Sequence, residues 1–301
     1  MQRIMITGSK GLLGSSLANN ISNAIEHTRE KANLLDLTQT NNYIEAEAPD
    51  TIIHCAAKVG GVFSNMKDNN GFFSENVKIN SNILESALNN NVENFISILS
   101  TCIFPNDNVS YPLTANQLDL GSPHSSNSGY SYAKRLLYYQ TKMYRNFTGK
   151  NWISVIPTNV YGKNDYYHLE NSHLIPALIR KAYEASLTGN DFIVWSDGTP
   201  LRQFIYSDDL SKLILWSIDN WKREEPFMAI NENEYSIKDI AVIIADRFNV
   251  LSKMKFDTSK PNGQFKKTAK SDFKDFEFTS LEEGLNNTID WFIKNYAIIR
   301  K

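Results

Sequence analysis

The sequence has 301 residues, which is enough for one large α/β domain or for two closely joined ones. Its hydrophobic and charged fractions of 42% and 21% are typical of a globular protein, and a net charge of −2 gives no sign of a nucleic-acid or membrane-surface partner. Two cysteines argue against a disulfide framework and fit a reducing cytoplasm. No signal peptide is evident, and no apolar run approaches the roughly 20 residues that span a bilayer.

The first expected elements are a buried strand at residues 3–7, a glycine-rich loop and a helix. The loop has the spacing Gly-x-x-Gly-x-x-Gly, which departs from the more widespread Gly-x-Gly-x-x-Gly. Glycines between a strand and a helix let the backbone approach a pyrophosphate and expose helix N-terminal amides to it. The alternative is a plain strand-to-helix turn. The loop predicts a dinucleotide site, with contacts expected from Gly8, Lys10, Gly11, Leu12 and Gly14.

The end of a second strand, expected near residues 24–28, distinguishes between the two nicotinamide dinucleotides. An acidic residue there would bind the ribose 2′-hydroxyl of NAD, whereas arginine accommodates the 2′-phosphate of NADP. Arg29 lies at this position, and Lys10 is able to reach the same phosphate. The sequence therefore favours NADP(H). Glu26 and Glu30 lie close by, and a shift of one residue in the strand end would weaken this preference.

Further cofactor contacts are expected after the second and third strands. Asp36 and Leu37 lie in a short link, with Asp36 placed to meet an adenine edge. The third strand, at residues 51–55, ends in Ala56, Ala57 and Lys58. Small residues at this point allow the backbone to lie against the cofactor.

The fourth strand introduces candidate catalytic residues. A helix at residues 76–90 precedes a strand at 94–99, and Ser100, Thr101 and Cys102 follow directly. Residues just beyond the carboxyl end of a parallel strand face the ligand crevice. The alternatives are a backbone-bonded hydroxyl for Ser100 and simple burial for Cys102.

A loop at residues 106–127 leads to the sequence Gly-Tyr-Ser-Tyr-Ala-Lys at 129–134. On a helix, Tyr130 and Lys134 lie one turn apart on the same face. A free tyrosine titrates near pH ~10, so it exchanges protons at neutral pH only when a neighbouring charge stabilises its phenolate. An ordinary surface helix is the alternative reading.

The strand at residues 152–157 completes a β-α alternation that predicts a right-handed parallel sheet. It ends in polar residues that include Asn159. The C-terminal part is less regular, with a strand at 192–195 and helices expected at 174–186, 206–220, 236–248 and 280–295.

The glycine loop, Ser100, Tyr130 and Lys134 together resemble the extended short-chain dehydrogenase/reductase superfamily. Five stretches resemble the GDP-L-fucose synthase family in order and spacing, namely 56–61, 100–105, 157–162, 171–178 and 195–204. The resemblance spans almost the whole chain. It implies a Rossmann-type doubly wound parallel sheet with a smaller, mostly C-terminal α/β substrate domain. The NADP-binding domain is expected at residues 1–163 plus about 204–220, and the GDP-sugar domain at about 164–203 and 221–301.

That family epimerises carbons 3 and 5 of GDP-4-keto-6-deoxy-mannose and then reduces carbon 4 with NADPH, in nucleotide-sugar biosynthesis for surface polysaccharide. The resemblance implies that Tyr130 donates a proton to the developing alkoxide and that Ser100 or Thr101 hydrogen-bonds the carbonyl oxygen. Lys134 would lower the pKa of the tyrosine and hold the nicotinamide ribose. Cys102 and His173 match the acid and base of the epimerisation.

The resemblance also implies contacts to the substrate. Asn159 matches a residue that positions the sugar, and it lies with Pro157 near the cofactor. Trp195, Arg202 and Lys260 match positions that contact the guanine nucleotide and its diphosphate. Residues 259–267 are expected to form a mobile basic loop suited to an anionic substrate. A homodimer is usual among such enzymes, and no metal site is expected.

Two departures from the family pattern leave alternatives open. The loop at 106–128 lacks the usual Glu-rich sequence, and residues 163–168 differ from the usual Gly-Pro-His-Asp-Asn-Phe run beside His173. In one alternative, the substrate is a different 4-keto sugar, such as a heptose. In the other, the protein only reduces a GDP-4-keto-heptose that another enzyme has epimerised. An NAD-retaining 4-epimerase or 4,6-dehydratase is a further alternative, although residues 100–102 lack the acids usual in dehydratases. A non-enzymatic nucleotide sensor would be expected to have lost catalytic residues.

Overall fold

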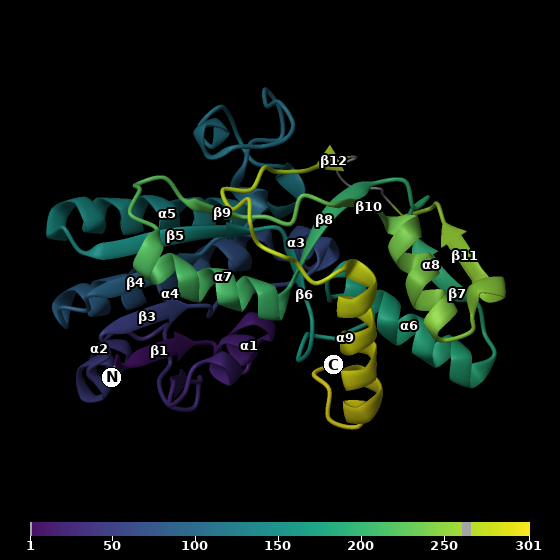
Figure 1. Cartoon of the computed structure of the whole chain (residues 1–301), viewed down its shortest axis with the longest axis horizontal. Coiled ribbons are helices and arrows are strands. Elements are labelled where there is room, and N and C mark those ends of the chain that lie inside the picture. Colours follow the sequence, from purple (N-terminus) through teal and green to yellow (C-terminus); the bar gives the residue numbers. More distant parts are fainter. Residues whose placement is uncertain (1, 261–265) are drawn as a thin grey trace.

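A six-stranded parallel sheet forms the larger part of the molecule in the computed structural model, which describes residues 2–260 and 266–301 (Figure 1). Its strands are β1 (Ile4–Thr7), β2 (Ile25–His27), β3 (Thr51–His54), β4 (Asn94–Ile98), β5 (Asn151–Pro157) and β9 (Phe227–Ala229). They lie in the order β2-β1-β3-β4-β5-β9, and every pair is parallel. The chain reverses direction across the sheet between β1 and β3, so the predicted doubly wound fold class is confirmed.

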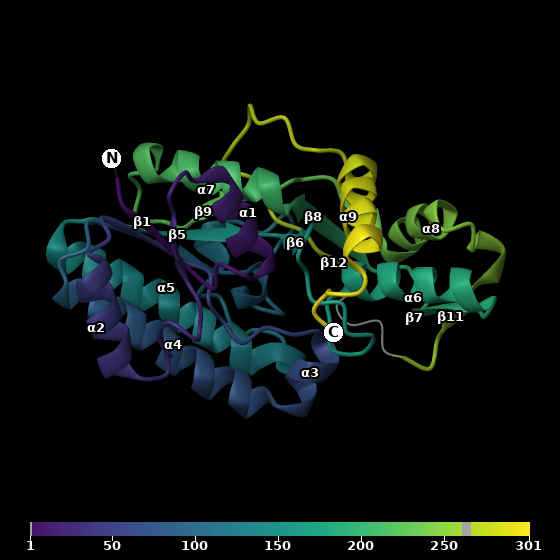
Figure 2. The same cartoon turned by 90° about the horizontal axis from the view of Figure 1, so that it is seen from below.

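Helices cover both faces of this sheet (Figure 2). One face is covered by α2 (Leu37–Glu47), α4 (Asn69–Asn89) and α5 (Ser128–Thr148), and the other by α1 (Leu12–Asn20) and α7 (Ser207–Asn220). Neighbouring strand residues point to opposite faces, so each central strand contributes to both cores. Met5, Ile52, Phe95 and Trp152 lie in the first core, and Ile6, Ile53, Ile96 and Ile153 lie in the second.

The smaller part lies at one end of the sheet (Figure 1). Its helices are α6 (Leu174–Thr188), α8 (Ile237–Arg247) and α9 (Leu281–Asn295), which share a separate hydrophobic cluster. One small sheet contains β6 (Asn159–Tyr161), β8 (Leu201–Tyr206), β10 (Glu234–Ser236) and β12 (Lys266–Lys267). A second pairs β7 (Phe192–Trp195) with β11 (Met254–Asp257).

Short elements complete the chain, and the sequence did not predict them. They are α3 (Val62–Lys67), η1 (Thr101–Ile103), η2 (Ala115–Gln117), η3 (Ser125–Asn127) and η4 (Leu251–Lys253). Helix α4 begins at Asn69 rather than near residue 76, because the Asp68 side chain caps it by accepting a hydrogen bond from the Gly71 amide. The expected mobile loop at 259–267 falls largely outside the described residues.

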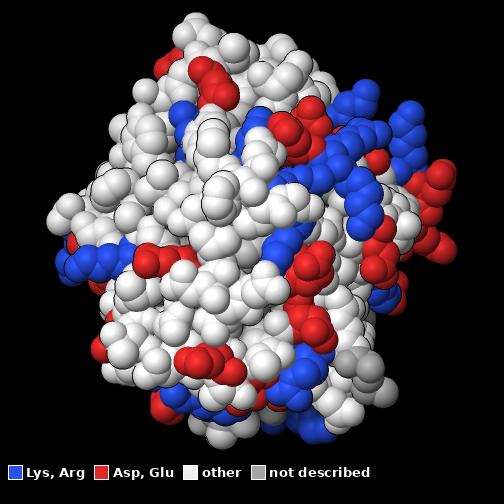
Figure 3. Space-filling model, turned by 90° about the vertical axis from the view of Figure 1, so that its left-hand side faces the viewer, with Lys and Arg blue, Asp and Glu red and all other residues white. Residues whose placement is uncertain are grey.

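The surface agrees with the near-zero net charge. On the face drawn in Figure 3, acidic and basic side chains are interspersed among neutral ones, without a broad area of one sign. None of the helices in residues 2–260 and 266–301 is long and apolar enough to cross a membrane.

Candidate active site

The glycine loop lies at the point where the sheet reverses direction. Gly8 follows β1 with a φ of +66°, and a Cβ at this position would lie 2.9 Å from the Cα atom of Ala56, which follows β3. A Cβ at Gly14 would overlap the Gly8 carbonyl oxygen. Only glycine allows this close backbone packing. Helix α1 then begins at Leu12 without a described side-chain cap, so its first amides are available to an anion.

The residues expected around the adenosine end have different surroundings. Arg29 is exposed two residues after β2, and the Lys10 ammonium lies 4.0 Å from the Glu30 carboxylate. Asp36 caps α2, because its carboxylate accepts hydrogen bonds from the Gln39 amide and side chain, both at 3.0 Å. Each carboxylate oxygen keeps a further acceptor position, so a contact of Asp36 with an adenine edge stays a prediction. Leu37, 37% exposed, begins the same helix.

Ala56, Ala57 and Lys58 follow β3 and are partly buried. The Lys58 amide donates to the Asn76 side chain at 2.9 Å. Its ammonium donates to Asp68 at 2.8 Å and to Glu75 at 2.6 Å. The Lys58 charge is thus paired with two carboxylates, so this segment offers a cofactor mainly its backbone.

Tyr130, Lys134 and Cys102 come together at the carboxyl end of β4. The Lys134 ammonium donates to the Ile98 carbonyl at 2.7 Å and lies 5.8 Å from the centre of the Tyr130 ring. Ser100 precedes η1, and its hydroxyl accepts a hydrogen bond from the Cys102 amide at 3.3 Å. Thr101 and Cys102 are buried within η1. The structure therefore brings together four residues that lie up to 34 positions apart in the sequence.

Burial governs the titration of the tyrosine and the lysine. It lowers the pKa of the Lys134 ammonium to about 8, against an opposite effect of the thiols of Cys55 and Cys102. It also raises the pKa of Tyr130, and Cys102 adds to this rise. Both effects on Tyr130 disfavour its phenolate, so the role of Lys134 in lowering the tyrosine pKa stays a prediction. Tyr130 is consequently protonated at neutral pH, which is the state of a proton donor.

The next strand brings Asn159 to the same edge of the sheet. Pro157 ends β5, and Asn159 begins β6 with an exposed side chain whose amide donates to the Gln203 carbonyl at 2.8 Å. The β6 to β8 pairing places Asn159 opposite Phe204. This link joins the crevice side of the large sheet to the smaller part of the chain.

His173 is exposed and precedes α6 directly. The loop before it is bound to the start of α3, because the Gly61 amide donates to the Asn171 carbonyl at 2.8 Å. Asp165, in the preceding segment, is 5% exposed, and its Oδ2 has no hydrogen-bond partner among the described residues. Burial raises the pKa of this carboxyl, while the charges of His173 and Arg300 oppose the rise.

Trp195 lies at the end of β7 among aromatic and basic side chains. The Phe63 ring lies 5.0 Å from it edge-on, and the ammonium groups of Lys181 and Lys260 lie 4.0 and 5.4 Å from the indole centre. Burial lowers the pKa of Lys181 to about 8. A cavity of about 440 Å³ opens beside Trp195 and Lys181. Such an aromatic surface surrounded by cations suits a flat base carrying a phosphate.

Arg202 lies in β8, paired in register with Lys267 of β12. Burial lowers the pKa of Arg202 and also that of Lys267, the latter to about 8. The Cys102 thiol opposes the shift at Lys267, whereas the Arg202 charge adds to it. The effect of the thiol shows that this basic pair lies close enough to Cys102 to interact with it electrostatically.

Sequence reasoning missed Phe63, Asp165 and Lys181 and treated Lys267 only as part of a basic stretch. Lys181 carried a signal, since it lies on α6 eight residues after His173. Phe63 and Asp165 carried none, because each depends on contacts with distant segments.

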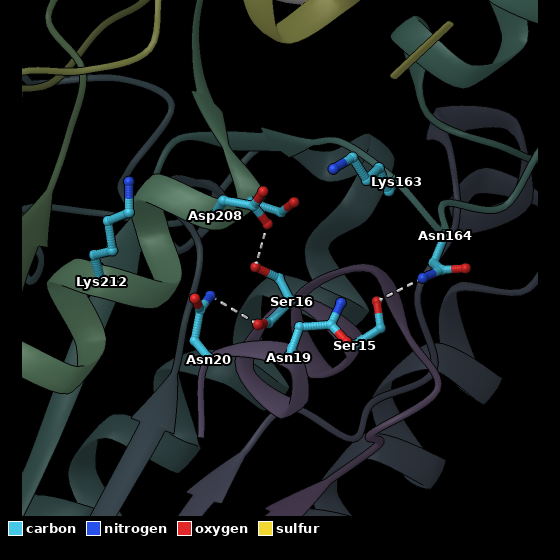
Figure 4. A pocket seen from close by; sticks show the side chains of 9 residues that line it. Ser15, Ser16, Asn19, Asn20, Lys163, Asn164, Asp208 and Lys212 are labelled. Carbon is cyan, nitrogen blue, oxygen red and sulfur yellow. Dashed lines mark hydrogen bonds between the residues drawn. The ribbon is translucent and has the colours of Figure 1, made fainter. Parts of the chain in front are cut away.

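A separate polar pocket of about 250 Å³ lies between α1 and α7 and contains none of the predicted site residues (Figure 4). Its hydrogen bonds are structural. The Asn164 amide donates to Ser15 at 3.1 Å, and Ser16 donates to Asp208 at 2.7 Å. The first bond holds the segment before Asp165 against α1, and the second joins α1 to α7. Within the described part of the chain, no cluster of acidic, histidine and cysteine side chains is suited to a metal ion.

Comparison with known proteins agrees with this arrangement. The NAD dependent epimerase/dehydratase family model matches residues 4–231. A GDP-L-fucose synthase of Dictyostelium discoideum is 39% identical over 312 residues, which cover 99% of this chain and 97% of its own. This chain belongs to the GDP-L-fucose synthase family. A solved GDP-L-fucose synthetase from Naegleria fowleri bound to NADP is 36% identical, with a TM-score of 0.91 over 100% of this chain and 96% of its own.

A relative with a different named product is also similar to this chain. A GDP-L-colitose synthase of Yersinia pseudotuberculosis is 31% identical, over 97% of this chain and 98% of its own. The names of these two relatives therefore share the GDP group and differ in the sugar.

Proposed function

We propose that the protein binds NADP(H) and reduces carbon 4 of a GDP-4-keto-6-deoxy-sugar after epimerising carbons 3 and 5 in the same site. The observation that carries this proposal is the grouping of Ser100, Cys102, Tyr130 and Lys134 beside a glycine loop at the reversal point of the sheet. The names of the relatives, with 39% identity over almost the full length, support the nucleotide-sugar substrate.

The residues at the loop fit a dinucleotide cofactor. Gly8 and Gly14 let the end of β1, Ala56 and the start of α1 pack closely, so that the loop backbone and the first amides of α1 can approach a pyrophosphate. Arg29 and Lys10 bind the 2′-phosphate, and the Lys58 and Asn159 segments line the nicotinamide end. When bound, NADPH supplies the hydride for carbon 4.

The chain provides the proton chemistry. Ser100 donates a hydrogen bond to the C4 carbonyl oxygen, and Tyr130 gives this oxygen its proton during reduction. The Lys134 charge stabilises the phenolate that remains. Cys102 and His173 exchange protons at the acidified carbons next to the ketone, from opposite sides of the sugar.

We further propose that Trp195 stacks on the guanine, with Lys181, Arg202, Lys260 and Lys267 around the diphosphate. The domain division is proposed at residues 1–163 plus about 204–220 for the cofactor part, with β9 added because it pairs with β5 in the large sheet. Packing of α7 against the large sheet supports the second of these segments, because Leu210, Leu213 and Ile214 share a core with Ile6 and Ile96.

A homodimer through α4 and α5 is proposed on the basis of an apolar stripe. Tyr132, Leu136, Met143 and Phe147 recur at helical spacing along α5 and are 40%, 38%, 59% and 82% exposed. Phe73 of the adjacent α4 is 40% exposed. A second copy of the chain would bury this stripe.

Replacing Tyr130 by Phe removes the proton donor without changing the ring. NADPH oxidation with GDP-4-keto-6-deoxy-mannose should fall by about 10²- to 10⁴-fold, while NADPH binding stays within about twofold. Stopped-flow absorbance at 340 nm measures NADPH oxidation, and fluorescence titration measures NADPH binding. Tyr132→Phe, on the same helix, is the matched control. Unchanged turnover in Tyr130→Phe would refute the assignment.

The rate of reduction should depend on the charge of Lys134. This ammonium is charged below its pKa of about 8 and loses its proton as the pH rises through that value, so kcat/KM should fall there while Tyr130 stays protonated. Lys134→Arg keeps its charge and should show no fall near pH 8, at a lower overall rate. A wild-type kcat/KM that is flat well beyond pH 8 contradicts this role.

Replacing Arg29 by Ala should weaken NADPH binding by roughly tenfold or more and leave NADH binding nearly unchanged, since only NADPH carries the 2′-phosphate. Isothermal titration of both dinucleotides measures the difference. Lys31→Ala is the control, because the Lys31 ammonium donates to the Glu26 carbonyl at 2.6 Å. Equal losses for the two dinucleotides would exclude a 2′-phosphate contact.

Sedimentation velocity at micromolar concentration should give a dimer for the wild-type chain. Leu136→Asp should give a monomer, because it introduces a charge into the stripe. Leu187→Asp makes the same change at a residue of α6 that is 66% exposed, and it should remain dimeric. A monomeric wild-type protein would contradict the proposed interface.

A further inference from the structure

A buried chain of hydrogen bonds runs from the glycine loop to the helix that carries Tyr130 and Lys134. The Ala56 amide donates to the Thr7 hydroxyl oxygen at 3.1 Å, and this hydroxyl lies 2.8 Å from Nδ1 of His54. Nε2 of the same imidazole lies 3.1 Å from Oδ1 of Asn80, whose Nδ2 lies 3.3 Å from the Ala133 carbonyl oxygen. The chain thus joins β1, β3, α4 and α5.

Chemistry fixes the direction of every bond. A carbonyl only accepts, so Asn80 presents its Nδ2 to Ala133 and its Oδ1 to His54. Nε2 of His54 therefore carries the proton and donates a hydrogen bond to Asn80, while Nδ1 accepts a hydrogen bond from the Thr7 hydroxyl. The Thr7 oxygen then accepts from the Ala56 amide. His54 is a neutral imidazole in one tautomer, and each polar group of the chain is used.

Burial protects this arrangement from water. Thr7 and His54 are 0% exposed, and Asn80 is 1% exposed. Burial, together with the Lys134 charge, lowers the pKa of His54 to about 3. The imidazole thus stays neutral over the physiological range, and Nδ1 remains an acceptor for Thr7.

The two ends of the chain lie at the two halves of the proposed reaction site. At one end, Thr7 directly precedes Gly8, which packs against Ala56 at the glycine loop. At the other end, Ala133 directly precedes Lys134, whose ammonium is held by the Ile98 carbonyl. A change at either end of this chain therefore alters hydrogen bonds that connect it to the other end through the side chains of Thr7, His54 and Asn80.

We propose that Thr7, His54 and Asn80 are positioning residues that set the place of the Tyr130–Lys134 turn relative to the bound cofactor. The proposal rests on the reductase activity proposed above. Breaking the chain leaves a buried donor or acceptor unpaired and releases the first turns of α5 from the glycine loop. Misplacement of a proton donor by a fraction of an ångström slows reduction, even when the cofactor still binds.

A residue that only stabilised the fold would behave differently. Its loss would lower the melting temperature, but reduction by the remaining folded protein would be unchanged. Thr141 provides this comparison, because it is a buried hydroxyl of the same helix α5 that lies 2.6 Å from the Ser97 hydroxyl and is outside the chain.

The test compares Thr7→Val, Thr7→Ser and Thr141→Val, with His54→Gln and His54→Phe as a second pair. Valine removes the Thr7 hydroxyl at nearly constant shape, whereas serine retains it. Glutamine supplies one donor and one acceptor in place of the imidazole, whereas phenylalanine supplies neither. Melting temperature, NADPH affinity and single-turnover NADPH oxidation are measured for each variant.

Thr7→Val and Thr141→Val should both lower the melting temperature by several degrees. Thr7→Val should also slow single-turnover reduction by about tenfold or more at saturating NADPH, and Thr7→Ser should restore it. His54→Gln should retain more activity than His54→Phe. Thr7→Val with a rate within about twofold of that of Thr141→Val would overturn the proposal.

Hydrogen exchange separates this proposal from the proposed function. With NADPH bound, amides at residues 130–137 should exchange faster in Thr7→Val than in Thr141→Val. This result would support the positioning role even if the wild-type protein failed to reduce any GDP-4-keto sugar, a failure that would refute only the proposed function. Equal exchange in the two variants would refute the positioning role.

Discussion

The close approach of two backbone segments at the reversal point of the sheet is the constraint on which the rest of the structure depends. Gly8 and Ala56 follow neighbouring strands and leave no room for a side chain between them. A dinucleotide is accommodated here because helix α1 starts at the same place without a described side-chain cap, so its first amides are available to an anion. The proposed catalytic residues must lie at a fixed distance from this loop, and α4 and α5 set that distance by packing against the same sheet.

Burial then gives the site its chemistry. Tyr130 and Lys134 are removed from water, so the phenol keeps its proton while the ammonium is poised near neutral pH. These opposite shifts suit a proton donor whose phenolate requires a neighbouring positive charge only after the proton has been transferred. The same loss of hydration lowers the pKa of Lys181 and Lys267 to about 8, so an anionic diphosphate would restore a charge that burial disfavours.

Most of the parallel sheet was predictable, because its strands are apolar, short and separated by helices with clear periodicity. The glycine loop, Ser100, Tyr130 and Lys134 were predictable because each lies within a few residues of such a strand or helix. The small sheet of β6, β8, β10 and β12 was not, since it pairs Asn159 with Phe204 and Lys267 with Arg202 across long sequence separations. The capping role of Asp36 and the ion pairs of Lys58 were hidden for the same reason: they depend on partners whose positions follow from the fold.

The measurement that tests the central claim most directly is product analysis in deuterated water. The purified protein is incubated with GDP-4-keto-6-deoxy-mannose and NADPH, and deuterium in the product is located by NMR. The account predicts NADPH oxidation together with deuterium at carbons 3 and 5, with loss of that deuterium in Cys102→Ser and His173→Gln. Reduction without deuterium at these carbons would contradict it, because the protein would then act as a reductase alone.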